Sequence, residues 1–327
     1  MKHILALIVA LAVTPATADV ARVVETHILP GYTAFAEATA ALRDTAADDC
    51  AVPTVRPAWN AAFDAWLGVS HLHFGPVEEA GRSVAIAYWP DERSAGPRAL
   101  AKLIADQDLI IFTDGGTAQL SVAARGLFGL EYLLYDPQFE SSDEYNCALI
   151  AALSNDLAQV AADILYDWEN GYAETLLTAG DPENRTYLTE REGTQALFTS
   201  LMTGLEFTAD VRIGRPMGTF DRPRPNRAES WRSERSKRNV LLSLKALSAL
   251  STALTDVPSP VTDADFAKAI AMTETLDDPV FATVVDPQGR FRIEVLQQSI
   301  NDTRAAVLAE LGKSLGVSAG FNSADGD

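Results

Sequence analysis

Histidine, cysteine and basic residues are scarce in this sequence, and each shortage narrows the chemistry open to the chain. Its 327 residues include 4 histidines and 2 cysteines. No H-E-x-x-H segment is present, which excludes the commonest zinc protease arrangement. Lysine and arginine together number 26, against 45 aspartates and glutamates, which gives a net charge of −19. A nucleic-acid partner is therefore not expected, because such binding needs a basic footprint.

Long apolar runs are also missing, apart from one short run at the N-terminus that has the form of a secretory signal. Lys2 precedes an apolar run at residues 4–13, and small residues at positions 16 and 18 come before Asp19. This order is typical of a signal peptide cleaved after Ala18. The run is shorter than the roughly 20 apolar residues of a transmembrane helix, and no later uninterrupted apolar run approaches that length. We therefore expect export to the periplasm or cell envelope, removal of residues 1–18, and a soluble mature chain without a transmembrane span.

The two cysteines, Cys50 and Cys147, are an even set in a chain that we expect to reach an oxidising compartment. One disulfide between them is expected there, and two free thiols are the alternative. Cys50 follows the first expected helix and Cys147 opens a long one. The bridge would therefore tie together two helices of one bundle.

Helical periodicity dominates the rest of the chain, and no strand pattern of useful length occurs. The expected helices are residues 20–45 with a kink near Pro30, 53–69, 97–106, 117–135, 143–177 with an N-cap at Ser141 or Ser142, 187–213, 231–254, 263–275 and 290–315. Residues 71–96 and 214–227 carry turn signals and are expected to be irregular. The predicted fold class is all-α, in two helical bundles. The first bundle is expected at residues 19–180 and the second at 181–315, followed by a disordered tail at 316–327.

A short sequence echo suggests an internal duplication. The residues Gly-Leu-Glu-Tyr at 129–132 recur as Gly-Leu-Glu-Phe at 204–207. In each copy the glutamate, Glu131 or Glu206, is the only charge in a long apolar window. A duplicated bundle and a chance match between alanine- and leucine-rich helices both explain this pattern.

The segment around Glu131 resembles the G-x-H-x-x-E motif of the imelysin-like family, a group named after a proposed bacterial metallopeptidase. Gly126 and Glu131 match this motif, and Phe128 occupies the histidine position. Other positions that agree in order and spacing are residues 28–32, Trp66, residues 74–77 and Cys147. The resemblance covers residues 20–315. It implies a helical fold of two bundles, a cell-envelope location and an association with iron uptake.

The substitution at Phe128 weakens the metal site that this resemblance implies. Histidine and glutamate at positions i and i+3 share one helix face and could hold a metal together. Phenylalanine cannot ligate a metal, and a lone glutamate leaves too few protein ligands for a typical zinc site. The interpretation therefore leans against an enzyme. Glu131 stays a candidate metal ligand. The sequence identifies no cofactor, and weakly held iron or zinc is the candidate.

Glu131 is expected to be buried near the junction of the bundles, because apolar residues surround it. A buried carboxylate needs a partner or a proton, and the expected partner is an arginine, a histidine or a cation. The arginines considered are Arg82, Arg98 and Arg125. An ordinary structural ion pair, or a position on a wetted strip of the helix, is the alternative.

His71 and His73 could supply the missing imidazole if a turn brings them together, and two ordinary loop histidines are the alternative. His27, beside the expected kink, is more often a core residue in such a position. The full candidate ligand site comprises Gly126, Phe128, Glu131, Arg125, His71 and His73.

These observations predict a non-catalytic exported protein that serves the acquisition or handling of a metal, above all iron. Its expected partner is an envelope protein of metal uptake or redox chemistry. One alternative is a metallopeptidase that uses Glu131 with histidines from elsewhere in the chain. Another is a scaffold that binds a partner protein and no small ligand. Residues 222–227 form a basic loop that could dock an acidic partner or simply be solvated.

Overall fold

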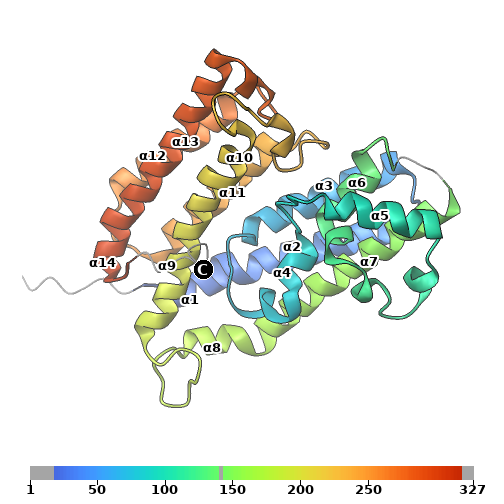
Figure 1. The fold of residues 1–327 in the computed structure, drawn as a ribbon. Coiled ribbons are helices and arrows are strands. Elements are labelled where there is room, and N and C mark those ends of the chain that lie inside the picture. The colour runs from blue at the N-terminus through green and yellow to red at the C-terminus, as the bar shows by residue number, and fades with distance from the viewer. Residues whose placement is uncertain (1–17, 140–142, 319–327) are drawn as a thin grey trace, which may run out of the picture.

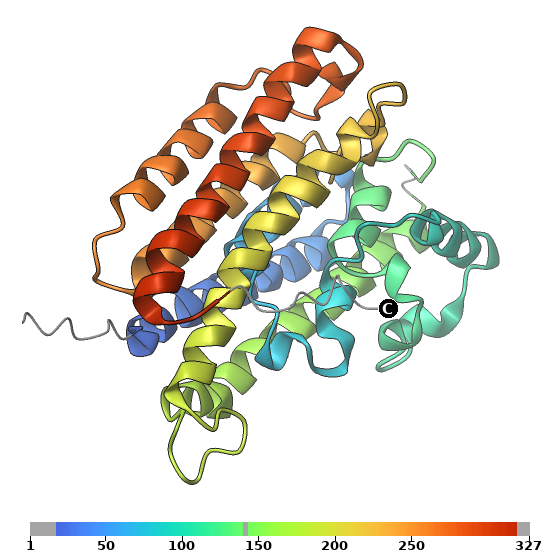
Figure 2. The same cartoon turned by 60° about the vertical axis from the view of Figure 1, so that its left-hand side comes forward.

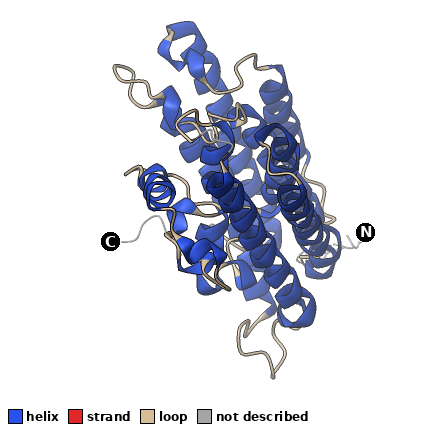
Figure 3. Cartoon of the chain, turned by 90° about the vertical axis from the view of Figure 1, so that its right-hand side faces the viewer, coloured by secondary structure: helices blue, strands red, loops and turns tan. Residues whose placement is uncertain are grey.

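The structure is a computed structural model that describes residues 18–139 and 143–318. Helices make up nearly all of its regular secondary structure (Figures 1 and 3). Within these two ranges the only β interaction is an isolated bridge between Thr219 and Arg222. The predicted all-α fold with two helical bundles is therefore confirmed. The expected boundary near Gly180 falls in the connection between α8 and α9, and the internal duplication stays a prediction.

The N-terminal bundle is built around α2. Its long helices are α2 (Leu29–Asp48), α3 (Val52–Val69), α6 (Gly126–Tyr135) and α7 (Glu144–Asp167). α2 packs against both α3 and α7, and α6 packs against α3 and α7. Trp59, Phe63 and Trp66 recur on one face of α3 and are all buried. This aromatic face supplies much of the apolar surface that holds the bundle together.

Shorter elements extend and cover this bundle. They are α1 (Val20–Val23), a π-helical turn (Val24–Ile28), α4 (Arg82–Ile86), α5 (Ala95–Asp106), a second π-helical turn (Trp168–Tyr172) and α8 (Ala173–Leu177). The first π-helical turn lies directly before α2. The kink expected near Pro30 therefore takes the form of a π-helical turn between α1 and α2.

The C-terminal bundle stands at a steep angle to the first (Figures 1 and 2). Its helices are α9 (Glu190–Glu206), α10 (Gly214–Met217), α11 (Ser236–Leu254), α12 (Pro260–Thr275), α13 (Pro287–Val307) and α14 (Lys313–Leu315), with π-helical turns at Phe207–Ile213 and Leu308–Gly312. α11 packs against α9 and α12 within this bundle, and against α1 and α3 of the first. α11 is therefore a main link between the two bundles.

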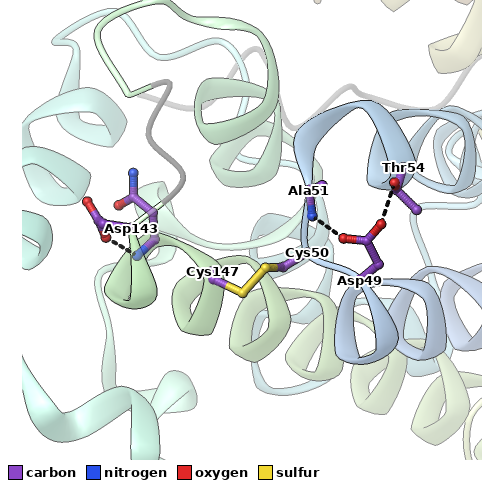
Figure 4. Close-up of a disulfide and its surroundings, with 7 residues drawn as sticks. Asp49, Cys50, Ala51, Thr54, Asp143 and Cys147 are labelled. Carbon is purple, nitrogen blue, oxygen red and sulfur yellow. Dashed lines mark hydrogen bonds between the residues drawn. A yellow bond between two sulfur atoms is a disulfide. The ribbon is translucent and has the colours of Figure 1, made fainter.

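The predicted disulfide between Cys50 and Cys147 is confirmed (Figure 4). Cys50 lies between α2 and α3, and Cys147 lies in the first turn of α7. Their Cα atoms are 5.3 Å apart, and 97 residues separate them in the sequence. The bridge therefore closes a long loop and ties the α2–α3 turn to α7.

Two helices begin later than the sequence predicts. The helix expected at 117–135 begins at Gly126, because this residue has a φ of +62° and cannot continue a helix from the preceding turns. The helix expected at 231–254 begins at Ser236, because Ser230 and Glu234 have positive φ values and form an irregular loop before it. Asp143 caps α7 by accepting a hydrogen bond from the backbone N of residue 146. The caps expected at 141 and 142, and most of the expected tail, lie outside the described residues.

One helical stretch, Glu144–Leu177, is long and apolar enough by length and composition to cross a membrane. Half of its most apolar window is buried inside the protein, and α2 and α6 pack against it. Asp156, within this stretch, forms an ion pair with Arg125 in which both side chains are largely buried. A core helix has the same composition, so the stretch is weak support for a membrane span.

Candidate functional site

Gly126 fixes the place where α6 begins. Its φ of +62° is a conformation that glycine adopts without strain. A side chain at this position would clash with the backbone carbonyl oxygens of Ala85 and Ile86, at the end of α4. The missing side chain therefore lets α6 approach this segment closely. That approach brings Phe128 and Glu131 into the interior.

Glu131 is buried, as its apolar surroundings predict, with 3% of its surface exposed. Its Oε1 accepts hydrogen bonds from the backbone N of Ser233 at 3.1 Å and from Ser233 Oγ at 2.7 Å. Ser233 lies in the loop before α11, so this contact joins the two bundles. Burial raises the pKa of Glu131 to about 7, and the Ser233 hydrogen bonds and the charge of Arg232 oppose this rise. The carboxyl can therefore gain or lose a proton near neutral pH.

The arginines expected beside this carboxyl are engaged elsewhere or exposed. Arg125 donates two hydrogen bonds to Asp156, each at 2.9 Å, in a bidentate ion pair. Arg82 donates to Asp167 at 2.7 Å, and Arg98 is exposed. The expectation that one of these three arginines binds the carboxyl is therefore wrong. A serine hydroxyl and a backbone amide supply the hydrogen bonds without adding a charge.

The loop at residues 228–235 holds Ser233 in place through buried polar contacts. Glu229 accepts hydrogen bonds from Nε of Arg212 at 2.8 Å and from Nδ2 of Asn239 at 3.1 Å. The backbone oxygen of Glu229 accepts a hydrogen bond from Oγ of Ser236 at 2.6 Å. Buried hydrogen bonds of this kind restrain a loop. The loop is therefore a fixed part of the site.

Phe128, which the resemblance aligns with the motif histidine, packs into an aromatic cluster. Its ring meets Phe63 edge-on at 5.5 Å between centroids and stacks on Trp89 at 6.3 Å. Trp89 in turn meets Phe207 edge-on at 6.0 Å. Phe207 opens the π-helical turn that follows α9. The cluster therefore forms an apolar contact between the bundles on the same helix that carries Glu131.

The three histidines of the described chain separate into a buried pair and an exposed residue. The Nε2 atoms of His27 and His71 lie 2.9 Å apart, and both side chains are largely buried. Burial lowers the pKa of His27 to about 4 and that of His71 well below its ordinary value. His73 is exposed and pairs with Glu78 at 3.3 Å. His71 and His73 therefore do not converge on one site, and His71 instead meets His27.

Comparison with known proteins shows which family this chain belongs to. Residues 28–307 match the imelysin family. This chain belongs to the imelysin family. It is 22% identical over 308 residues to a protein called iron-regulated protein A from Synechococcus elongatus, with 85% of this chain and 80% of that protein covered.

Two solved structures have the same fold. One is an imelysin-like protein from Psychrobacter arcticum 273-4, with a TM-score of 0.78, 20% identity, and coverage of 92% of this chain and 96% of the other. The second is described as an iron-regulated protein A precursor from Parabacteroides distasonis ATCC 8503, with a TM-score of 0.74, 13% identity, and coverage of 91% and 94%. At these identities the likeness concerns the fold alone.

A metal centre of the kind implied by the G-x-H-x-x-E motif of the imelysin family does not fit the residues found here. The Phe128 ring lies in the aromatic cluster and offers no ligand atom, and Glu131 is held by Ser233. Across residues 18–139 and 143–318, no three or more His, Cys, Asp or Glu side chains form a group that could hold a metal ion. A catalytic zinc normally has three protein ligands, so we derive no hydrolytic step at this motif.

Sequence reasoning missed the part of this imelysin-family site that comes from the second bundle. Ser233, Glu229 and Arg212 all take part in its hydrogen bonds. Ser233 was expected in a helix at residues 231–254, and Glu229 was given no role. A signal was present, since residues 229–238 carry six charged side chains among ten residues. So dense a run of charges fits poorly in a helix that must bury one face.

Proposed function

We propose that this chain serves iron acquisition or handling in the cell envelope, after export through a cleaved signal peptide, and that it does not hydrolyse peptides. An envelope protein of metal uptake or redox chemistry is its proposed partner. The iron-related names of its relatives from Synechococcus elongatus and Parabacteroides distasonis support the role in iron handling. The acidic composition, with a net charge of −19, suits the attraction of cations.

The observation that carries the non-catalytic part of this proposal is the environment of Glu131. A metallopeptidase glutamate must ligate the metal or take a proton from a metal-bound water. Here the carboxyl lies 3% exposed under the loop before α11 and accepts two hydrogen bonds from Ser233. Phe128 fills the adjacent ligand position with an aromatic ring. In this proposal the hydrogen bonds between Glu131 and Ser233 link the two bundles, and the Glu131 carboxyl can take up or release a proton.

Metal analysis of protein purified from the periplasm without an affinity tag tests the role in metal handling. We expect iron, or the capacity to bind it, in the purified protein. We also expect slower growth under iron limitation in a strain that lacks the gene, and normal growth after complementation. A protein without bound metal or metal affinity would support the scaffold alternative instead.

Incubation of the same protein with a peptide library tests the non-catalytic part. We expect no cleavage, with or without added zinc or iron. Cleavage that a chelator abolishes would contradict the proposal and support the metallopeptidase alternative. Glu131→Ala is the matched control, because loss of cleavage in this variant would assign the activity to the motif.

A further inference from the structure

We propose that His27 and His71 form a two-imidazole site for a divalent transition-metal ion at the junction of the two bundles. The proposal rests on the metal-handling function above and gives that function a location. It concerns residues outside the G-x-H-x-x-E motif. Its basis is the geometry of the pair, the elements that carry it and the cavities that reach it.

The pair is assembled from distant parts of the fold. His27 lies in the π-helical turn Val24–Ile28, between α1 and α2, and single π-helical turns inside helices are frequent at functional sites. His71 follows the end of α3 by two residues. A Cβ added to Gly204 of α9 would lie 3.0 Å from the Cβ of His71. α9 of the second bundle therefore packs closely against His71, because Gly204 has no side chain there.

The two Nε2 atoms lie close enough together to serve one ion. Their Nε2 atoms face each other at 2.9 Å, and the ring planes are inclined by 49°. In a tetrahedral zinc site with bonds of about 2.0–2.1 Å, two ligand nitrogens lie about 3.3 Å apart. To admit an ion, the rings would separate by a few tenths of an ångström and turn so that both Nε2 lone pairs point at it. The proton now shared between the Nε2 atoms would move to Nδ1 of its own ring, so both imidazoles stay neutral and no proton is released.

The charges around the pair permit a cation. The nearby Arg212 guanidinium is neutralised by Glu229 at 2.8 Å, in an ion pair whose two side chains are both buried. Neutral imidazole is the form that ligates metals, and zinc, copper, iron and nickel all accept it. The pair supplies only two ligands, so water would complete the coordination. Such a site would bind an exchangeable ion and differs from a closed structural site with four protein ligands.

His27 lines two cavities that open to solvent. One, of about 600 Å³, is lined by Arg22, Thr26, His27 and Asp263, among others. The other, of about 380 Å³, is lined by Pro30, Gly31 and Lys245 beside His27. His27 is thus a lining residue of both cavities. They provide a path for a hydrated ion and room for the waters that remain bound to it.

Titration of the mature protein with Zn²⁺, and with Fe²⁺ under anaerobic conditions, tests the site by calorimetry. We expect one ion per chain, and a loss of affinity of at least tenfold in His27→Gln and in His71→Gln. His73→Gln is the matched control, because His73 is exposed and pairs with Glu78, and its affinity should be unchanged. Co²⁺ should give a visible absorption spectrum of imidazole ligation in the wild-type protein that is lost in the two buried variants.

The outcomes separate this site from the proposed function. Metal binding that survives unchanged in both buried variants would overturn the site and leave the metal-handling role intact. No binding by the wild-type protein would overturn both the site and direct metal handling. If either variant fails to fold, imidazole ¹⁵N NMR of the wild-type protein decides. The Nε2 resonances of His27 and His71 must shift with Zn²⁺, and unshifted resonances in a metal-bound protein would overturn the site.

Discussion

Replacing Glu131 by glutamine isolates the protonatable carboxyl from the rest of the site. The glutamine amide has nearly the same shape as a protonated carboxyl, and its Oε1 can accept both hydrogen bonds from Ser233. It cannot ionise, so it reproduces the neutral form at every pH. The difference in unfolding free energy between Glu131→Gln and the wild-type protein therefore reports the cost of ionising the buried group.

The size of this difference follows from the pKa of Glu131, which is about 7 in the folded chain against an ordinary value of 4.5. Between these values the unfolded chain has lost the proton and the folded chain keeps it, so the wild-type protein loses stability as the pH rises. One pKa unit corresponds to about 1.4 kcal/mol, so the full cost above neutral pH is about 3 kcal/mol. The variant should therefore gain about 2.5 kcal/mol relative to the wild-type protein between about pH 5 and pH 8.

Urea unfolding of both proteins at about pH 5 and pH 8, with the disulfide intact, measures this change. His27 and His71 have lowered pKa values and act in the opposite direction, since they lose stability as the pH falls. Both are present in the two proteins, so their contribution cancels in the comparison. Ser233→Ala should enlarge the pH-dependent loss, because its hydrogen bonds favour the charged carboxylate. A stability difference between Glu131→Gln and the wild-type protein that is equal at both pH values would refute the reasoning.

Three further predictions concern the disulfide, the start of α6 and the N-terminus of the exported protein. Replacing both Cys50 and Cys147 by serine should lower the unfolding free energy by about 4 kcal/mol or somewhat less, and an unchanged urea midpoint would contradict this. Gly126→Ala should destabilise by more than about 2 kcal/mol, because a positive φ adds to a clash with carbonyl oxygens. Gly115→Ala, with a similar φ but open space around it, should cost only about 1 kcal/mol. The periplasmic protein should begin at Asp19 by intact mass, and a species that retains residues 1–18 would disprove this cleavage site.

Most of the fold could be predicted from the sequence, because helical periodicity and turn residues are local signals. α3 and α12 match expected segments within a few residues. So do α2, α7 and α13 when they are counted with the π-helical turns and short helices that continue them. The start of α6 was predicted too early, although Gly126 was recognised as part of the motif. The sequence alone does not show that a glycine inside an apolar run has a positive φ. Its positive φ fits the close approach of Ala85 and Ile86, which is a tertiary contact.

Only the part of the candidate site that lies in the first bundle, around Glu131, could be predicted from the sequence. Its partner Ser233 lies 102 residues away in the sequence, in a loop that contains neither glycine nor proline. Ser230 and Glu234 have positive φ values there, which non-glycine residues rarely adopt. No turn residue marks the break, and the run of charges at residues 229–238 is its one local sign. The meeting of His27 with His71 likewise depends on how the helices pack. Spacing along the chain cannot supply such pairings.

The most direct test of the central claim compares metal affinity in the wild-type protein, Glu131→Ala and Phe128→His. The claim is that Glu131 serves as a protonatable contact to Ser233 and contributes little to metal binding. Calorimetric titration with Fe²⁺ and Zn²⁺ should then show little change in Glu131→Ala. Phe128→His should raise the affinity by more than Glu131→Ala lowers it, because it restores two ligands on one helix face. Tight binding by the wild-type protein that Glu131→Ala abolishes would contradict the account.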